Sequence, residues 1–443
     1  MIFSSIGFIL FFIFFFSSIK FLNKNQKIII ILFSLFFYSY SNLIFIFLIL
    51  YLTLITFICY KKNFPLIVSI FFIISPLLYY KYSFFILKNI GFSENSIFIY
   101  KSELPLAISF ITFTALAYVI DAKKNIYNEK VGFFSFLEFI VYFPHLIAGP
   151  ILRAKELIPI LKKKIIFEND NIKFGIILFT IGFVKKVYFA DTIGSIIDPI
   201  FLNPNLATHS ELLKGFLLFP LQIYFDFSGY VDMALGTSNI FSINLPINFN
   251  KPYLTMSLSQ FWRNWHITLS TWFRDYLYIP IGGSKKGVFR TFLNLIITMS
   301  IAGLWHGANF NFIIWGFLNG LILFFEKKFF QLDSLNKSLR VFINCFLIFN
   351  LWLIFRIQNL DFLLDYVILL YSNIGNIISF DNLLILFFTI FSVFIQKFDN
   401  YFSLKKISKK IKLKYFLPIS IGLIISGLSF VSGGSDKFIY FNF

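Results

Sequence analysis

The chain has 443 residues, of which 58% are hydrophobic and only 14% are charged, and its mean hydropathy is +0.80. Because so few charges cannot cover the surface of a soluble protein of this size, the composition excludes a soluble globular domain and indicates a polytopic helical membrane protein. The formal net charge of +18 comes largely from short Lys clusters between apolar runs. This pattern is typical of cytoplasmic loops beside anionic membrane lipid and argues against nucleic acid as a partner.

Apolar segments follow one another along the whole chain. The first, "MIFSSIGFILFFIFFFSSIK", has neither a positive n-region nor a small-residue cleavage site, so we interpret it as a retained membrane helix. Some later segments are too short to cross a bilayer alone, and we expect about 11 or 12 transmembrane helices, with the rest re-entrant or interfacial. No Pro/Ser/Gly linker and no internal repeat divides the chain, which predicts a single membrane-embedded domain over residues 1–443. The apolar segments lie near residues 2–19, 28–40, 43–59, 64–80, 104–120, 133–151, 174–197, 212–240, 291–308, 310–326, 341–356, 361–374, 382–396 and 416–432.

The stretch 241–290 differs from these segments because it mixes aromatic residues with Arg, His and Asp. It is too polar for a span that faces lipid and too aromatic for a solvent loop, and Trp and Tyr favour the boundary between membrane and water. The Ser-x-x-Gln sequence at Ser257 resembles a capping box, and the following apolar residues lie near helical spacing: Trp262, Trp265, Leu269, Trp272 and Tyr276. We therefore expect a helix over 257–278 that lies at, or dips into, one membrane interface.

A single histidine, His306, lies in "SIAGLWHGANFNF" (300–312), a run that otherwise has the character of a membrane helix. A titratable side chain in hydrocarbon costs at least about 2.5–3.5 kcal/mol and therefore usually marks a pathway or a site. Gly303 and Gly307, four residues apart, predict a helix face that another backbone approaches closely. A neutral imidazole in such a place can accept a hydroxyl proton as a general base. The alternative is a buried histidine bonded to a helix carbonyl.

The other three histidines differ in their surroundings. His266, in "WRNWHITLS", is either a second residue of the same cavity or an interfacial aromatic with a polar edge. His145 precedes Gly149-Pro150, where we expect a helix to end, and a structural role is favoured. His209, in "NLATHSEL", has the character of a loop or helix-start residue outside the bilayer.

Acidic and basic candidates are few. Asp226 and Asp232 are about 240° apart around a helix, so they do not form a hydrolytic carboxylate pair. Asp226, near Tyr224, either lines a polar funnel or is a buried carboxylate that holds helices together. Lys285 and Lys286 follow a Gly-rich turn that could hold phosphates, although a cytoplasmic turn that obeys the positive-inside bias explains them equally simply.

The two cysteines, Cys59 and Cys345, lie in apolar segments without a C-x-x-C or His-rich partner. This argues against a disulfide framework and a Cys-based metal site, and we expect no metal.

Taken together, several segments resemble the membrane-bound O-acyltransferase family, and the alginate O-acetyltransferase branch, which includes peptidoglycan O-acetyltransferases, is the most similar. The resemblance is good from about residue 104 to 326, and it is specific because the motifs occur in combination. His145 stands where a different polar residue is expected. The segments are "ISFITFTALAYVIDA" (108–122), "FPHLIAGPILRAKEL" (143–157), "YFDFSGYVDMALG" (224–236), "LPINFNKPYL" (245–254), "FWRNWHITLSTWFRDYLYIPIGG" (261–283), "RTFLNLIITM" (290–299) and "GLWHG" (303–307).

The resemblance implies a ring of helices around a central tunnel in the inner membrane of a bacterium. His306 matches the histidine regarded as catalytic, and His266 matches the second motif histidine. The donor would be cytoplasmic acetyl-CoA, held near Lys285 and Lys286, and the acetyl group would pass to a cell-envelope polysaccharide through a periplasmic SGNH-type acetyltransferase. The residues expected to line or support the tunnel are Tyr224, Asp226, Trp262, Arg263, Trp305 and Asn309.

Three other functions are considered. A D-alanyl transferase of the teichoic-acid type would take its donor from a carrier-protein thioester and shares the "DFSGY" and Trp-His segments. A transporter of lipid-linked glycans would use the same buried polar residues, but it predicts inverted repeats that the sequence does not show. A membrane scaffold would leave His306 and the polar 241–290 stretch unexplained.

Overall fold

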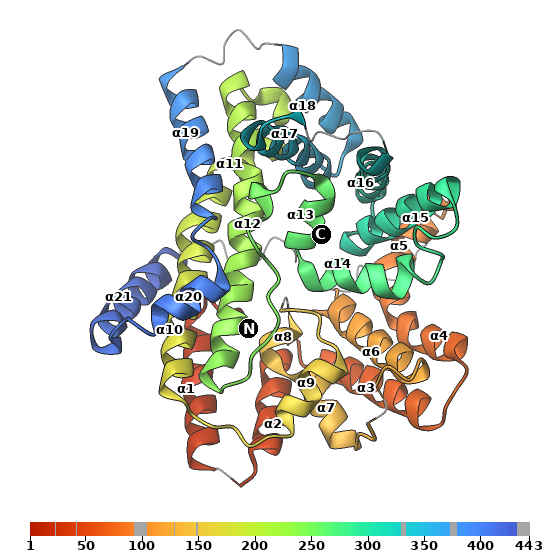
Figure 1. Ribbon diagram of the computed structural model, residues 1–443, viewed down its shortest axis with the longest axis vertical. Helices are drawn as coiled ribbons and strands as arrows, with labels where there is room; N and C mark the ends of the chain where they lie inside the picture. The colour runs from red at the N-terminus through yellow and green to blue at the C-terminus, as the bar shows by residue number, and fades with distance from the viewer. Residues whose placement is uncertain are drawn as a thin grey trace. The chain divides into compact units, whose positions relative to one another are not determined.

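The structure is a computed structural model that describes residues 1–22, 24–40, 42–92, 104–127, 129–147, 149–328, 334–372 and 379–431. Within these ranges the chain forms helices and turns and no β-strand. The all-α class expected from the sequence is therefore confirmed (Figure 1).

Four helical segments are long and apolar enough to cross a membrane: Leu66–Asn89, Val288–His306, Phe310–Lys328 and Lys337–Arg356. Five shorter apolar helices accompany them in the described chain, at Ile6–Phe21, Gln26–Ser39, Phe45–Lys61, Phe380–Ile395 and Leu413–Ser429. Many large apolar side chains on these helices are exposed, such as Ile67 at 82% and Phe387 at 66%, as a lipid-facing surface requires. The total of about 11 or 12 spans stays a prediction.

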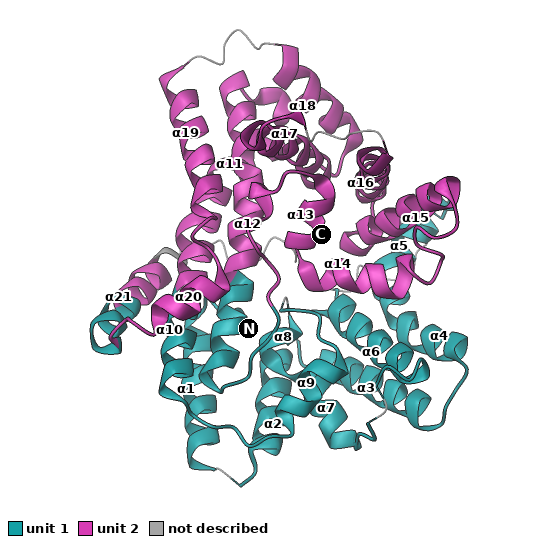
Figure 2. Cartoon of the chain, in the orientation of Figure 1, with its two compact units in different colours: residues 1–180, 230–246, 413–421 teal, residues 181–229, 247–412, 422–443 magenta. Residues whose placement is uncertain are grey.

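The chain divides into two compact units, each drawn from three separate stretches (Figure 2). Unit 1 comprises residues 1–180, 230–246 and 413–421, and unit 2 comprises residues 181–229, 247–412 and 422–443, of which 432–443 lie outside the described residues. The helices α10 (Asn169–Val184), α12 (His209–Ile240) and α21 (Leu413–Val431) each contribute residues to both. A single domain over residues 1–443 stays a prediction.

Unit 1 is built from the N-terminal helices. Its core is rich in Phe rings: those of Phe11 and Phe15 each meet Phe143 at a centroid distance of 5.1 Å. The further elements of unit 1 are α1 (Ile6–Phe21), α2 (Gln26–Ser39), α3 (Phe45–Lys61), α4 (Leu66–Leu77), η1 (Leu78–Tyr82), α5 (Ser83–Asn89), α6 (Ile108–Lys123), α7 (Phe133–Val141), α8 (Phe143–Leu146) and α9 (Ala154–Leu161).

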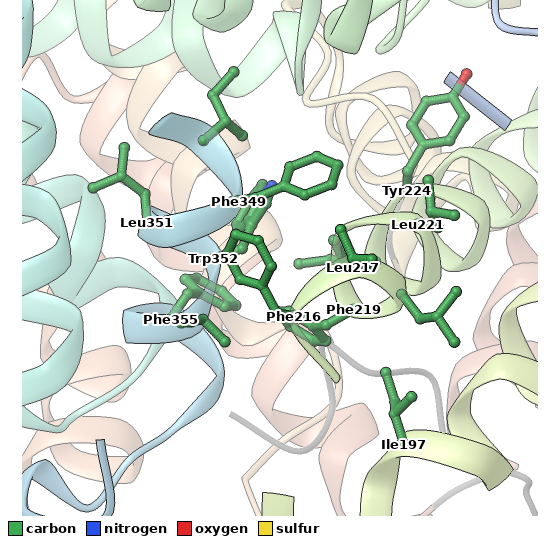
Figure 3. Packing of buried hydrophobic residues seen from close by; sticks show 14 of the residues in the cluster. Ile197, Phe216, Leu217, Phe219, Leu221, Tyr224, Phe349, Leu351, Trp352 and Phe355 are labelled. Carbon is green, nitrogen blue, oxygen red and sulfur yellow. The ribbon is translucent and has the colours of Figure 1, made fainter. Parts of the chain in front are cut away.

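Unit 2 contains the candidate site. Its apolar core is formed where α17 faces α12, and Figure 3 shows Phe349, Trp352 and Phe355 of α17 near Phe216 and Phe219 of α12. The further elements of unit 2 are η2 (Lys185–Asp191), α11 (Thr192–Leu202), η3 (Pro204–Leu206), η4 (Pro252–Leu254), α13 (Leu258–Asn264), α14 (Ile267–Phe273), η5 (Arg274–Tyr278), α15 (Val288–His306), α16 (Phe310–Lys328), α17 (Lys337–Arg356), α18 (Leu360–Ser372), α19 (Phe380–Ile395) and α20 (Tyr401–Ser408).

Candidate active site

His306 is the last residue of α15, which returns along α16 in a tightly packed hairpin. A Cβ atom added to Gly303 would lie 2.0 Å from the carbonyl oxygen of Phe312, and one added to Gly316 would lie 2.2 Å from that of Met299. Both distances are far below van der Waals contact, so only glycine permits this approach. The close backbone approach predicted from Gly303 is confirmed, and it places His306 at the point where the chain turns back. The prediction for Gly307 is wrong, because Gly307 lies just after α15 in extended conformation and faces the Phe312 ring instead of a backbone.

Aromatic rings surround the imidazole of His306. Its ring centroid lies 4.8 Å from that of Trp305, 5.4 Å from that of Trp315 in α16, and 5.0 Å from that of Phe355 in α17, each in an edge arrangement. The residue is only 7% exposed. Three elements therefore hold the imidazole in an apolar environment of the kind in which electrostatic interactions are strong.

His266 lies at a break between two short helices, and not within one helix over 257–278 as the sequence suggested. The predicted start is confirmed, because the Ser257 hydroxyl accepts a hydrogen bond from the Gln260 N–H at 3.2 Å. The helix stops after Asn264, and His266 has φ 42° and ψ 55°, the left-handed conformation. Such strained non-glycine residues cost about 1–3 kcal/mol and concentrate at functional sites.

The segment around Asn248 explains this break. The Asn248 backbone oxygen accepts from the N–H of Ile267 at 3.0 Å, and its side-chain oxygen accepts from the Thr268 hydroxyl at 2.7 Å. The Asn264 oxygen accepts from the N–H of Asn250 at 3.0 Å. Non-local hydrogen bonds therefore satisfy the backbone groups released where the helix is interrupted, and a sequence pattern cannot reveal them.

The two histidines both lie close to the indole ring of Trp305. The centroid of the Trp305 ring is 6.1 Å from that of His266 and 4.8 Å from that of His306. His266 also meets the Phe227 ring of α12 at 4.7 Å. His266 lies between α13 and α14, two helices that are too short to cross a membrane. Burial lowers the pKa of its imidazole to about 3. His266 is therefore a neutral ring of very low basicity.

A small cavity of about 180 Å³ reaches His306. Five of its lining residues come from α15, at positions that fall on one face of the helix: Leu295, Thr298, Met299, Ala302 and His306. At ~1.5 Å per residue this face extends about 16 Å from Leu295 to His306. The remainder of the lining is Trp262, Leu269, Ser270, Phe273, Arg274, Tyr278, Trp315 and Leu323.

A second cavity of about 920 Å³ shares three lining residues with the first: Tyr278, Leu295 and Leu323. The cations on its wall are Arg263, Lys327 and Arg340. They come from α13, the end of α16 and the beginning of α17, so the larger cavity lies toward the opposite end of α15 from His306. The same wall also carries Glu326, so its charged side chains have a net positive charge, and the two cavities adjoin at their three shared residues.

Several predicted tunnel residues lie around these cavities. Trp262 lines the smaller one, and its indole N–H donates to the Asn319 side-chain oxygen at 3.1 Å. Arg263 lines the larger one. Trp305 contacts both histidine rings, and Asn309 lies half-buried between α15 and α16, but neither residue is among the described residues that line the cavities. Lys285 and Lys286 are exposed in the turn before α15, and neither is among the described residues that line the two cavities.

Tyr224 and Asp226 belong instead to a buried group of charges that the sequence analysis did not anticipate. The ammonium of Lys186, 3% exposed, lies 2.6 Å from an oxygen of Asp191 and 2.6 Å from one of Asp226. Lys185 and the Tyr224 hydroxyl both contact Asp399 at 2.6 Å. Asp226 is thus a buried carboxylate that links helices, which was the second of the two interpretations offered.

The remaining two histidines bond to backbone carbonyls. His145 Nε2 lies 2.9 Å from the oxygen of Phe139 within unit 1, and His209 Nε2 lies 3.0 Å from that of Leu370 within unit 2. The helix that contains His145 ends at Leu146, before Gly149, as predicted. Among the described residues there is no group of three or more His, Cys, Asp or Glu side chains that could hold a metal ion.

The chain belongs to the membrane-bound O-acyltransferase family, whose model matches residues 122–364, more than half of its length. The family resemblance inferred from the motifs is therefore confirmed. The match includes both α15 and the region of the two cavities.

Individual relatives act on different envelope polymers according to their names. The chain is 42% identical over 264 residues to a probable alginate O-acetylase AlgI from Pseudomonas aeruginosa, covering 58% of this chain and 50% of the relative. It is 36% identical over 332 residues to a peptidoglycan O-acetyltransferase from Helicobacter pylori, covering 68% and 63%. It is 31% identical over 239 residues to a teichoic acid D-alanyltransferase from Bacillus subtilis, covering 50% and 60%. The chain spans about half the length of the first of these curated relatives.

Proposed function

We propose that the chain is a membrane O-acetyltransferase. It moves the acetyl group of cytoplasmic acetyl-CoA through the inner membrane toward a cell-envelope polysaccharide, with His306 as general base. The observation that carries this proposal is the face of α15 from Leu295 to His306, which lines a cavity that reaches the imidazole and adjoins a larger cavity whose wall has a net positive charge.

The two cavities fit the two parts of an acyl-CoA. The nucleotide is large and anionic, and the larger cavity, of about 920 Å³, carries Arg263, Lys327 and Arg340 on its wall. The pantetheine arm is long, thin and neutral, and the smaller cavity follows α15 for about 16 Å at ~1.5 Å per residue. In this arrangement the thioester lies beside His306, and Arg263, Lys327 and Arg340 take the role that the sequence analysis gave to Lys285 and Lys286.

The chemistry then needs one proton acceptor. A hydroxyl of the periplasmic partner, or of the glycan itself, gives its proton to the His306 imidazole as its oxygen attacks the thioester carbonyl carbon. The new C–O bond forms, the C–S bond breaks, and the departing thiolate takes the proton from the imidazolium. General-base assistance of this kind contributes about 10²–10⁴-fold.

The final acceptor is a hydroxyl of an envelope glycan, peptidoglycan or an alginate-like polymer, and a periplasmic SGNH-type acetyltransferase carries the acetyl group to it. Relatives named for alginate and for peptidoglycan acetylation support a glycan acceptor. The partner rests on the family resemblance alone.

D-alanyl transfer is the second candidate, because a relative named for it is 31% identical. A D-alanyl group carries a positive ammonium, which requires a nearby carboxylate in a buried site. No Asp or Glu is among the described residues that line the smaller cavity, whereas Arg274 is. The cavity therefore suits a neutral acyl group better than a cationic aminoacyl group.

The test uses inverted membrane vesicles that contain the full chain. Radiolabelled acetyl-CoA is supplied on the outside, and label in envelope glycan is counted. We expect transfer by the unaltered chain and a loss of at least about 100-fold in His306→Ala, since the general base is removed. His209→Ala is the matched control, because its imidazole contacts the Leu370 carbonyl of α18 and His209 is not among the residues that line either cavity, so this variant should retain activity.

Equal transfer by His306→Ala and the unaltered chain would remove His306 from the chemistry. Transfer from a D-alanyl carrier-protein thioester, with none from acetyl-CoA, would establish the second candidate. Movement of lipid-linked glycan without any acyl transfer would identify a transporter.

A further inference from the structure

Two threonines of α15 have the same burial and different hydrogen bonding. Thr291 and Thr298 lie two turns apart on the same helix, and each is 6% exposed. The Thr291 hydroxyl donates to the carbonyl oxygen of Gly287 at 2.8 Å, the bond that a buried helical threonine ordinarily makes to the preceding turn. The Thr298 hydroxyl has no hydrogen-bond partner within the part of the chain that the structure describes.

A buried hydroxyl without a partner destabilises the folded protein, because it has lost its hydrogen bonds to water without gaining others. Valine has nearly the same shape as threonine and would avoid this cost, so the threonine at position 298 needs an explanation other than packing. Thr298 lines the smaller cavity, on the face of α15 that leads to His306. The hydroxyl is therefore available to a molecule that occupies this cavity.

Other polar groups on the same wall already have partners. The Ser270 hydroxyl donates to the Trp265 carbonyl at 3.2 Å, and the Arg274 guanidinium pairs with Asp275 at 2.7 Å. Thr298 thus presents a hydroxyl in a section of the cavity whose other α15 residues, Leu295, Met299 and Ala302, are apolar. A ligand with a polar group at this depth would gain a hydrogen bond that an alkyl chain could not make.

The distance along α15 between Thr298 and His306 indicates which part of a bound donor would lie beside Thr298. Thr298 precedes His306 by about 12 Å of helix, at ~1.5 Å per residue. A thioester at His306 places the amides of a pantetheine arm along this stretch of the cavity, and each amide has both a donor and an acceptor.

We propose, on the basis of the function proposed above, that Thr298 binds the acyl donor: its hydroxyl hydrogen-bonds an amide of the pantetheine arm in the smaller cavity. Thr298 is a specificity-determining residue that distinguishes amide-bearing thioesters from simple alkyl thioesters. It does not act on the reacting atoms.

The test compares two donors, acetyl-CoA and the acetyl thioester of ethanethiol, which has no amide. In Thr298→Val we expect the KM for acetyl-CoA to rise about three- to tenfold, which is the range for the loss of one neutral hydrogen bond. The kcat for acetyl-CoA should change little, and the KM for the ethanethiol ester should not change. Thr298→Ser, which retains the hydroxyl, should restore the KM for acetyl-CoA. Thr298→Val should also keep or raise the thermal midpoint of the purified chain, because the unsatisfied hydroxyl is gone.

Thr291→Val is the matched control, since its hydroxyl is bonded within the helix. It should leave both KM values unchanged and should not raise the thermal midpoint. The proposal is overturned if Thr298→Val lowers the midpoint without changing either KM, or raises both KM values equally. Failure of the unaltered chain to use any acetyl thioester would instead overturn the proposed function.

Discussion

A group of buried charges surrounds Lys186 in unit 2, and removing such charges from water costs free energy. An ammonium that is 3% exposed lies between the carboxylates of Asp191 and Asp226. Lys186 follows Lys185 directly at the start of a π-helical turn, η2, and the two pair with different carboxylates, since adjacent residues point to different sides of a helix. Wider turns of this kind are frequent at functional sites. The ion pair between Lys186 and Asp226 joins η2 to α12. The same helix, α12, carries Phe227, whose ring contacts that of His266.

Removal of the Lys186 charge should destabilise the protein strongly. In Lys186→Met two carboxylates are left buried close together without a cation, and breaking a buried pair costs about 3–5 kcal/mol. We expect a clearly lower midpoint of unfolding for the purified chain in detergent, followed by the loss of helical signal.

Lys173→Met is the control for this prediction. Lys173 pairs at 3.2 Å with Asp170, whose side chain is 63% exposed, and a surface pair contributes about 0–1 kcal/mol. If Lys186→Met and Lys173→Met lower the unfolding midpoint equally, the buried ion pairs of Lys186 contribute no more to stability than the exposed pair of Lys173.

At the scale of elements, the hairpin of α15 and α16 determines where His306 lies. Gly303 and Gly316 bring the two backbones together, and Trp315 on α16 then meets the imidazole at 5.4 Å. A change in the separation of the two helices should therefore move Trp315 relative to His306. Glycine at these positions is a requirement of packing, since both lie inside helices with ordinary backbone conformation.

Gly316→Ala should destabilise the protein, because the new methyl group would lie 2.2 Å from the Met299 oxygen. Overpacking of this kind costs about 1–3 kcal/mol. We expect a lower thermal midpoint together with reduced acetyl transfer.

Gly422→Ala is the matched helical substitution, since a Cβ there would meet nothing within 4 Å. It should raise stability by roughly 0.5–1 kcal/mol, the difference between Gly and Ala in a helix interior. A midpoint for Gly316→Ala as high as that of the unaltered chain would show that the two helices can separate without cost.

At the scale of the whole molecule, the ends of α17 indicate how unit 2 crosses the membrane. Lys337 and Arg340 begin this helix beside the larger cavity. At its other end Arg356 pairs with Asp198 of α11 at 2.8 Å. With 20 residues, α17 is long enough to cross a bilayer. Because basic residues accumulate on the cytoplasmic side, the larger cavity should open to the cytoplasm.

Cysteine labelling tests this orientation. Ser284 lines the larger cavity. Leu206 marks the other end of α17: it is 85% exposed and lies in η3, just after α11, the helix whose Asp198 pairs with Arg356. With Cys59 and Cys345 replaced by Ser, a membrane-impermeant maleimide should label Leu206→Cys in intact spheroplasts and Ser284→Cys only in inverted vesicles. The reverse pattern would place the basic cavity outside and contradict a cytoplasmic donor.

The sequence by itself determined the class of the protein and much of its local structure. Hydropathy indicated membrane helices, the Ser257 cap marked the start of α13, and Gly303 marked a close helix approach. Several motifs in combination indicated the family that the match over residues 122–364 confirms. Each of these features depends on the chemistry of a few residues that are close together in the sequence, so the sequence alone is enough to predict it.

Only the tertiary structure decided which side chains meet. The lysines of η2 lie inside a run that has an apolar pattern, yet each has a carboxylate partner far along the chain, such as Asp399. The break at His266 depends on Asn248, and the basic wall of the larger cavity uses Arg263 and Arg340 from separate helices. Thr298 has no distinguishing local pattern. A cavity is the space that several packed elements leave unfilled, so its lining is a property of their arrangement and not of any one segment.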